Sequence, residues 1–131
     1  QHVPEIRTFL AGLGVPPGCA LHFVPLSAPV DRGILATCLF PAPEGLDPAA
    51  VLRDAYAAHP RVRLRDASPQ LRHVRGTAYC DLAAFTDGDR IAVTSAIDNL
   101  GRGAAAQAVH ALEVAVGFEG WSPLDGVGVV P

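Results

Sequence analysis

The 131-residue sequence predicts an α+β fold in which helices pack on one face of a mixed, mostly antiparallel sheet. Segments with helical and strand-like patterns follow the order helix, two strands, helix, three strands, helix. Hairpin-type links join several of the strands, and Asp87-Gly88 is the clearest of them. No glycine-rich turn joins a strand to a helix, as a nucleotide-binding βαβ unit would require. We expect residues 1–131 to form a single domain, because no internal repeat or linker divides them.

The first helix and the first two strands are predicted from proline, glycine and apolar spacing. Pro4 suits the first turn of a helix, where its missing N–H would be unpaired anyway, and Gly12 ends the helical pattern. The apolar run over residues 20–26 indicates a strand. The run over residues 33–40 is apolar on both alternating faces, which is typical of a strand covered on both sides.

The second half of the chain continues with a helix, three strands and a final helix. Asp47 followed by proline is typical of a helix N-cap, and this helix is expected to run to about His59, where Pro60 ends it. Strands are expected over residues 61–65, 73–82 and 90–97, with a hairpin between the last two. The final helix is expected over residues 103–116, with an apolar stripe opposite a polar face.

Composition and charge exclude several classes of function. The formal net charge is −3 and aspartates are interleaved with the arginines of residues 61–75, so we expect no nucleic-acid partner. The sequence has no apolar run long enough to cross a membrane and no recognisable leader, so we expect a cytoplasmic protein without a membrane partner. Cysteines and histidines share no metal-ligand spacing, so we expect no metal site. Cys38 and Cys80 lie in apolar strand patterns, where we expect buried thiols.

The first candidate for chemistry is the pair His2 and Glu5. Three residues apart at the start of a helix, they are expected to lie next to each other on one face. Histidine is the natural general acid or base near neutral pH, and a nearby carboxylate can orient it or bind a substrate amide. The alternative is an exposed terminal histidine beside a glutamate that favours the helix dipole.

The second candidate is Arg32, which stands with Gly33 at the entrance to an apolar strand. Its guanidinium group is suited to a carboxylate or phosphate. The alternative is an ion pair between Arg32 and Asp31 within a turn.

The third candidate is the segment over residues 96–107, where a strand ends in Asp98-Asn99 and small residues open a helix. Asn99 is suited to a planar amide such as nicotinamide, and Gly101 and Gly103 allow a ligand to approach the backbone. The alternative is a strand-to-helix turn that needs small residues only for tight packing.

Three segments of the chain, taken in order, carry a family resemblance. They are His2-Val3-Pro4-Glu5-Ile6, then Phe23-Val24-Pro25-Leu26 with Arg32-Gly33-Ile34-Leu35-Ala36-Thr37, and then Ile97-Asp98-Asn99-Leu100 with Gln107-Ala108-Val109. This set resembles the C-terminal part of the N-acetyl-gamma-glutamyl-phosphate reductase family, and the resemblance covers nearly the whole chain. It implies a substrate-binding and dimerisation domain similar to the C-terminal domain of glyceraldehyde-3-phosphate dehydrogenase.

The resemblance also implies an activity. Enzymes of that family use NADPH to reduce N-acetyl-gamma-glutamyl phosphate to the semialdehyde in arginine biosynthesis, through a thioester on a cysteine. By resemblance, His2 is the catalytic acid or base for that cysteine, Glu5 binds or orients the substrate, and Arg32 binds an anionic group of it.

For the cofactor, the resemblance implies that Asn99, Gly101 and Gly103 lie near the nicotinamide end of NADP. The family's dinucleotide-binding motif and cysteine segment lie upstream of the residues matched here, so an upstream half is expected to bind most of NADP. Cys19 follows the matched histidine and is not expected to be that cysteine. We therefore expect a fragment or one half of a split reductase, inactive without its upstream half and forming a homo-oligomer.

In that family the final helix and the tail pack on the nucleotide-binding domain. We therefore expect the apolar stripe of Ala105, Val109 and Leu112, or the tail from Trp121, to be poorly covered. Two alternatives remain open: a related semialdehyde dehydrogenase, and a stand-alone dimerising or small-molecule-binding module that keeps the sheet and does not use His2 in catalysis.

Overall fold

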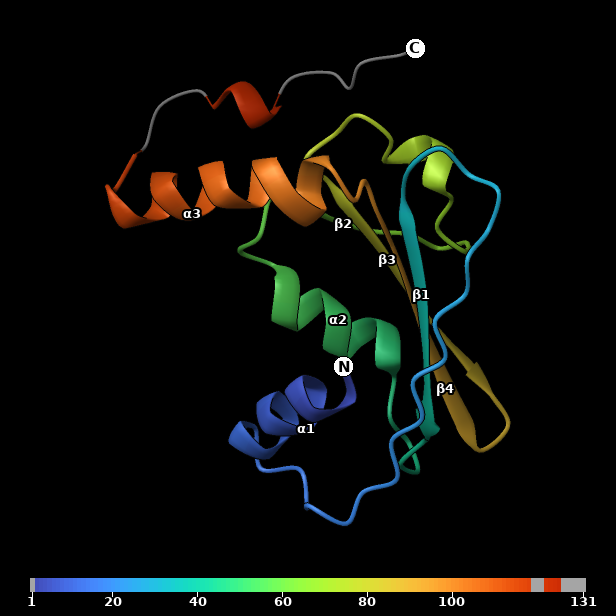
Figure 1. Ribbon diagram of the computed structural model, residues 1–131. Helices are drawn as coiled ribbons and strands as arrows, with labels where there is room; N and C mark the ends of the chain where they lie inside the picture. The colour runs from blue at the N-terminus through green and yellow to red at the C-terminus, as the bar shows by residue number, and fades with distance from the viewer. Residues whose placement is uncertain (1, 119–121, 126–131) are drawn as a thin grey trace.

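The computed structural model describes residues 2–118 and 122–125 (Figure 1). In chain order, its helices and strands are α1 (His2–Gly12), β1 (Ile34–Pro41), α2 (Pro48–Tyr56), β2 (Val62–Leu64), β3 (Cys80–Asp87), β4 (Arg90–Ile97) and α3 (Ala106–Ala115). Short 3-10 turns lie at Leu71–His73 and Pro123–Asp125, and a π-helical turn at Gly101–Ala105 leads into α3.

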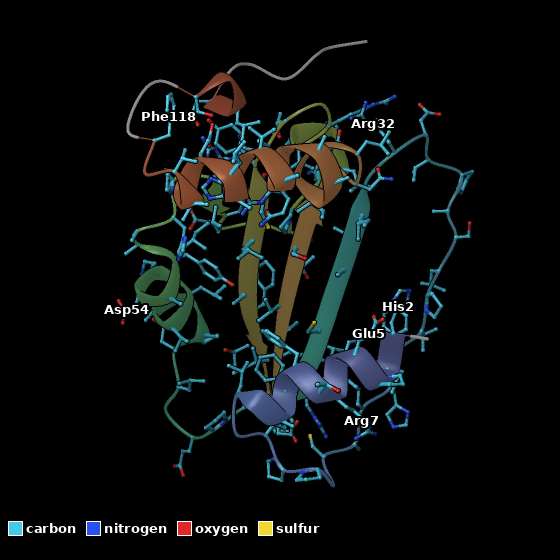
Figure 2. The ribbon with its side chains drawn as sticks, turned by 60° about the vertical axis from the view of Figure 1, so that its left-hand side comes forward. His2, Glu5, Arg7, Arg32, Asp54 and Phe118 are labelled. Carbon is cyan, nitrogen blue, oxygen red and sulfur yellow. The ribbon has the colours of Figure 1, made fainter. Side chains whose placement is uncertain are left out.

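The strands form one mixed sheet in the order β1-β4-β3-β2. β4 pairs antiparallel with both β1 and β3, whereas β2 pairs parallel with β3. In both views α1 and α2 lie on the same side of the sheet, and α3 runs across the end at which β4 finishes (Figures 1 and 2). The predicted α+β class, with a mixed and mostly antiparallel sheet, is confirmed.

Several predicted element boundaries are confirmed by local geometry. The hairpin between β3 and β4 turns at Gly88, whose φ of +57° is a left-handed conformation that glycine adopts without strain. Asp47 caps α2, because its carboxylate accepts hydrogen bonds from the backbone N–H groups of Ala49 (2.9 Å) and Ala50 (3.2 Å). The final helix ends at Ala115, and Gly117 just beyond its C-cap has a left-handed φ of +64°, which is typical of a glycine that terminates a helix.

The buried core is small and lies around β3 and β4. Its buried apolar side chains include Val74, Leu82, Ala83, Ile91 and Ala96. α2 covers β3 and β2, whereas α1 contributes no buried residue. The core is therefore concentrated on one half of the sheet and leaves the β1 half poorly covered.

β1 is exposed along its whole length, so the prediction of a strand covered on both sides is wrong for this chain. Leu35 and Leu39 are 53% and 72% exposed, and the thiol of Cys38 is exposed rather than buried. β1 is an edge strand that packs mainly on β4. The apolar pattern correctly predicted a strand, but nothing in the described part of the chain supplies the expected cover.

Two other strand predictions need correction. Residues 20–26 have no regular secondary structure, and most of them are exposed. Pro25 has no N–H to donate to a ladder, and β1 pairs with β4 instead of with this segment. The strand predicted over residues 73–82 begins only at Cys80, because the backbone N–H of Gly76 donates to the carboxylate of Asp98 (2.5 Å) instead of to a neighbouring strand.

The predicted exposure of the last helix is confirmed. Val109 and Leu112 are 41% and 62% exposed, and Ala105 is exposed as well. Trp121 lies outside the described residues, so the prediction for the tail stays a prediction. Together with β1, the stripe on α3 gives this chain a second apolar surface without cover.

Candidate functional site

The predicted site residues lie in two places (Figure 2). His2 and Glu5 belong to the first turn of α1, whereas Arg32 lies just before β1, well separated from them in Figure 2. Because β1 and β4 are antiparallel, the start of β1 meets the end of β4, where Asn99 and the turn Gly101–Ala105 follow. The structure therefore groups Arg32 with the second set and not with His2.

His2 and Glu5 are neighbours, as their spacing predicted. His2 Nδ1 lies 3.4 Å from Glu5 Oε2, and both side chains are exposed. The imidazole ring also lies edge-on to Phe23, with ring centroids 5.6 Å apart. This arrangement leaves Nε2 available to exchange a proton with a group presented to α1.

Arg32 is bound to Asp98 and not to Asp31. Its Nη2 lies 2.8 Å from both carboxylate oxygens of Asp98, and that carboxylate is fully buried. Asp31 accepts instead from Arg75 (2.8 Å), so the alternative of an Arg32–Asp31 pair is wrong. Arg32 Nε is buried and has no hydrogen-bond partner among the described residues, whereas the arginine side chain as a whole is 32% exposed.

Asp98 collects hydrogen bonds from three separate segments of the chain. Besides Arg32, it accepts from the backbone N–H groups of Gly76 (2.5 Å), Leu100 (2.9 Å) and Gly101 (2.7 Å). Both carboxylate oxygens are used, so the charge is compensated although no water reaches it.

The ionised form of Asp98 is strongly favoured. Burial alone would raise the pKa of this carboxyl, but the hydrogen bonds from Arg32 and three backbone N–H groups outweigh that effect and lower the pKa from 3.8 to about 2. Asp98 therefore remains a negatively charged anchor at any physiological pH.

Asn99 is fixed by the residue that follows Arg32. Its Oδ1 accepts from the backbone N–H of Gly33 at 2.7 Å. No described residue accepts a hydrogen bond from Asn99 Nδ2, so the side-chain amide is held through its oxygen and offers its donors. Such a group is suited to a carbonyl oxygen of a ligand.

The two glycines of the turn after Asn99 differ in how much space a side chain would have. A Cβ on Gly101 would lie 2.7 Å from the backbone oxygen of Thr77, which leaves no space for a side chain. A Cβ on Gly103 would meet Ile97 Cδ1 at 3.4 Å, and Gly103 itself is exposed. Gly101 thus serves close packing, and exposed Gly103 leaves the backbone open to a ligand.

Sequence reasoning missed Asp98 as the centre of this site. An aspartate that ends a strand reads as an ordinary turn residue, and Arg32, which binds it, is 66 positions away. One signal was present: Asp98 directly precedes the segment from Asn99 to Gly103, which was selected for its polar and small residues.

A second buried cluster was also missed, and it surrounds Arg61. Its Nε lies 3.1 Å from Asp125 Oδ1, its Nη2 3.3 Å from Glu113 Oε2 and its Nη1 2.5 Å from His110 Nδ1. Ser122 donates to Glu113, and this bond above all lowers the pKa of the Glu113 carboxyl. Because each nitrogen of the guanidinium has a partner, the cluster fastens the segment 122–125 to α3 and β2.

Two searches of the described residues complete the site. No group of three or more His, Cys, Asp or Glu side chains in residues 2–118 and 122–125 is arranged to hold a metal ion. No helix in that part of the chain is long and apolar enough to span a membrane.

The sequence is similar to a known family and to curated proteins. Residues 1–99 match the family described as "Semialdehyde dehydrogenase, dimerisation domain". The chain is 41% identical over 135 residues to the N-acetyl-gamma-glutamyl-phosphate reductase of Salinispora arenicola, and 39% identical over 138 residues to that of Methanopyrus kandleri. Each alignment covers 100% of this chain and 39% of the relative, at its C-terminal portion. The chain thus spans about two-fifths of the length of these relatives.

The buried carboxylate of Asp98 makes stability sensitive to acid. Its pKa falls from 3.8 to about 2 on folding, so the ionised group stabilises the fold above pH 4, and this contribution is lost as the pH falls through about 2. The shift corresponds to about 2 kcal/mol. We expect the wild-type chain to lose about 2 kcal/mol more of its free energy of unfolding between pH 5 and pH 2 than Asp98→Asn, by urea denaturation. Equal losses in the two proteins would contradict this assignment.

Gly101 and Gly12 provide a matched pair of glycine substitutions. Gly101→Ala should lower the free energy of unfolding by about 1–3 kcal/mol, because the new Cβ meets the backbone of Thr77. Gly12→Ala should be neutral or stabilising by up to about 1 kcal/mol, because its Cβ has no atom within 4 Å and it lies at a helix end. Thermal or urea denaturation compares them, and equal effects would show that the Gly101–Thr77 contact is not tight.

Proposed function

Because the chain belongs to the semialdehyde dehydrogenase dimerisation-domain family, we propose that it is the C-terminal part of an NADPH-dependent N-acetyl-gamma-glutamyl-phosphate reductase. The observation that carries the proposal is the match of the whole chain to reductases of that name. The reaction converts N-acetyl-gamma-glutamyl phosphate to N-acetylglutamate semialdehyde and releases phosphate. The nucleophilic cysteine belongs to the upstream part of such an enzyme.

His2 is assigned the acid/base role. Glu5 contacts Nδ1 of the imidazole, which leaves Nε2 to act as the base. Nε2 accepts the proton of the nucleophilic cysteine thiol of the upstream part and returns it later in the reaction. The carboxylate of Glu5 orients the ring and stabilises its protonated form, or binds the substrate amide. Both side chains are exposed, which suits groups that act on a substrate held by another part of the enzyme.

The position of α1 explains why His2 lies apart from the second group. α1 has no buried residue and makes no extensive contact with another element, and residues 13–33 connect it to β1 without a helix or strand. The sheet of this chain therefore does not fix its placement. We assign that task to the upstream part of the enzyme, which seats α1 with His2 facing the reacting carbon.

Arg32 and Asn99 are assigned to the ligands. The partly exposed side chain of Arg32 is suited to an anionic oxygen of the substrate, and Asn99 Nδ2 to the carboxamide oxygen of nicotinamide. Gly101 and Gly103 keep the turn small beside that ring. These residues are suited to the nicotinamide end of NADP, and NADP supplies hydride when bound. The rest of the dinucleotide is assigned to the upstream part of the enzyme.

The exposed side of β1 is assigned to pairing with a second copy of the chain. Its apolar residues, which include Leu35 and Leu39, have the pattern of a covered strand and no cover in the described chain. An apolar surface of this kind is stabilised when a partner removes it from water. The description of the matched family as a dimerisation domain supports a homo-oligomer.

Activity should appear when this chain replaces the matched segment of the Salinispora arenicola reductase. We expect the chimera to catalyse NADP-dependent, phosphate-requiring oxidation of N-acetylglutamate semialdehyde, and the isolated chain to be inactive. His2→Ala should lower kcat/KM by about 10²–10⁴-fold. The exposed His22→Ala is the control and should have no effect. An inactive but folded and assembled chimera would favour a binding module, and preference for another semialdehyde would favour a related dehydrogenase.

The pairing surface can be tested with two leucines of similar exposure. Leu39 in β1 is 72% exposed and Leu13, which follows α1, is 68% exposed. Leu39→Arg should shift the chain or the chimera from dimer to monomer in analytical ultracentrifugation, because it places a charge in the proposed interface. Leu13→Arg should leave the dimer intact. A dimer that remains intact in both Leu39→Arg and Leu35→Arg would contradict the assignment of β1.

A further inference from the structure

The network around Asp98 joins the two residues that the proposed function assigns to ligands. Arg32 Nη2 binds the carboxylate of Asp98, and the next backbone N–H, that of Gly33, binds Asn99 Oδ1. Two consecutive residues before β1 are thus held by two consecutive residues after β4. This double contact continues the β1–β4 ladder, whose last pair is Ile34 with Ile97.

Asp98 also controls the backbone that follows Asn99. Its Oδ1 accepts from the N–H groups of Leu100 and Gly101, and its own backbone oxygen accepts from Gly103 at 2.9 Å. A third segment is attached through the N–H of Gly76. The direction of Arg32, the side chain of Asn99 and the course of the turn therefore all depend on one buried carboxylate.

We propose that Asp98 is a positioning residue of the reductase, which holds the anion-binding Arg32 and the amide-binding Asn99 in a fixed relation. This inference rests on the proposed function. Asp98 itself is fully buried and all its acceptor positions face the protein, so it does not touch either ligand. Its effect on the reaction is exerted through the alignment of the two groups that do.

An amide cannot replace this carboxylate. Each oxygen of Asp98 faces N–H donors, Oδ2 that of Gly76 and Oδ1 those of Leu100 and Gly101. Asp98→Asn would turn one oxygen into an NH₂ group that opposes another donor, and no water reaches the site to compensate. The variant keeps the size of the side chain and disrupts at least one of the attachments.

Asp81 provides the matched control. It is equally buried and is bound by Arg63 Nε at 2.6 Å and Arg65 Nε at 2.8 Å. It lies in the same sheet, on β3, and its hydrogen-bond partners are Arg63 and Arg65 instead of Arg32 or the turn after β4. Asp81→Asn therefore reproduces the loss of a buried, arginine-bound charge without disturbing the proposed ligand residues.

The experiment compares Asp98→Asn and Asp81→Asn in the chimeric reductase, with temperatures of unfolding measured for both. Both variants should unfold at lower temperature. Below those temperatures, only Asp98→Asn should raise the KM for NADP and lower kcat/KM by about 10²-fold, as expected for misaligned groups. In the isolated chain, amide hydrogen exchange should accelerate at residues 99–105 in Asp98→Asn and not in Asp81→Asn.

Equal kinetics and equal exchange at residues 99–105 in the two variants would overturn the inference. If the wild-type chimera has no reductase activity, the proposed function fails, and the exchange pattern still decides the structural half of the inference. Protection retained at residues 99–105 in Asp98→Asn would then refute Asp98 as the residue that holds the turn.

Discussion

The end of the sheet at which β1 begins and β4 finishes depends on a carboxylate, that of Asp98, which is buried without becoming neutral. Removing a charge from water costs several kcal/mol unless hydrogen bonds replace the lost hydration. Asp98 receives that replacement from Arg32 and from backbone donors on two segments, which keeps its pKa at about 2. Each donor stabilises the charge of Asp98, and that charge in turn holds each donor in place. The start of β1, the loop at Gly76 and the turn into α3 are therefore positioned together.

Elsewhere, this chain has apolar surface that the described residues do not cover. β1 is exposed throughout, and so are Val109 and Leu112 on α3. The two surfaces lie on different elements, β1 and α3. α1, with the exposed His2 at its first turn, also has no buried residue.

Sequence reasoning succeeded where the deciding interactions are local. The cap at Asp47, the hairpin at Gly88 and the His2–Glu5 contact each involve residues only a few positions apart. It failed where distant residues decide. The apolar pattern of β1 does not reveal whether its cover comes from the same chain, and the strand predicted over residues 73–82 starts late because Asp98 captures Gly76. Asp98 itself could not be recognised, since its partner Arg32 is 66 residues away.

An ionised Asp98 holds together the start of β1, the loop at Gly76 and the turn into α3. A pH titration of the Asp98 side-chain carboxyl carbon by NMR tests this arrangement. We expect the Asp98 signal to change only near pH 2, together with the amide signals of Gly76 and Gly101. A carboxyl that titrates with the ordinary value of 3.8 and leaves those amides unchanged would contradict it.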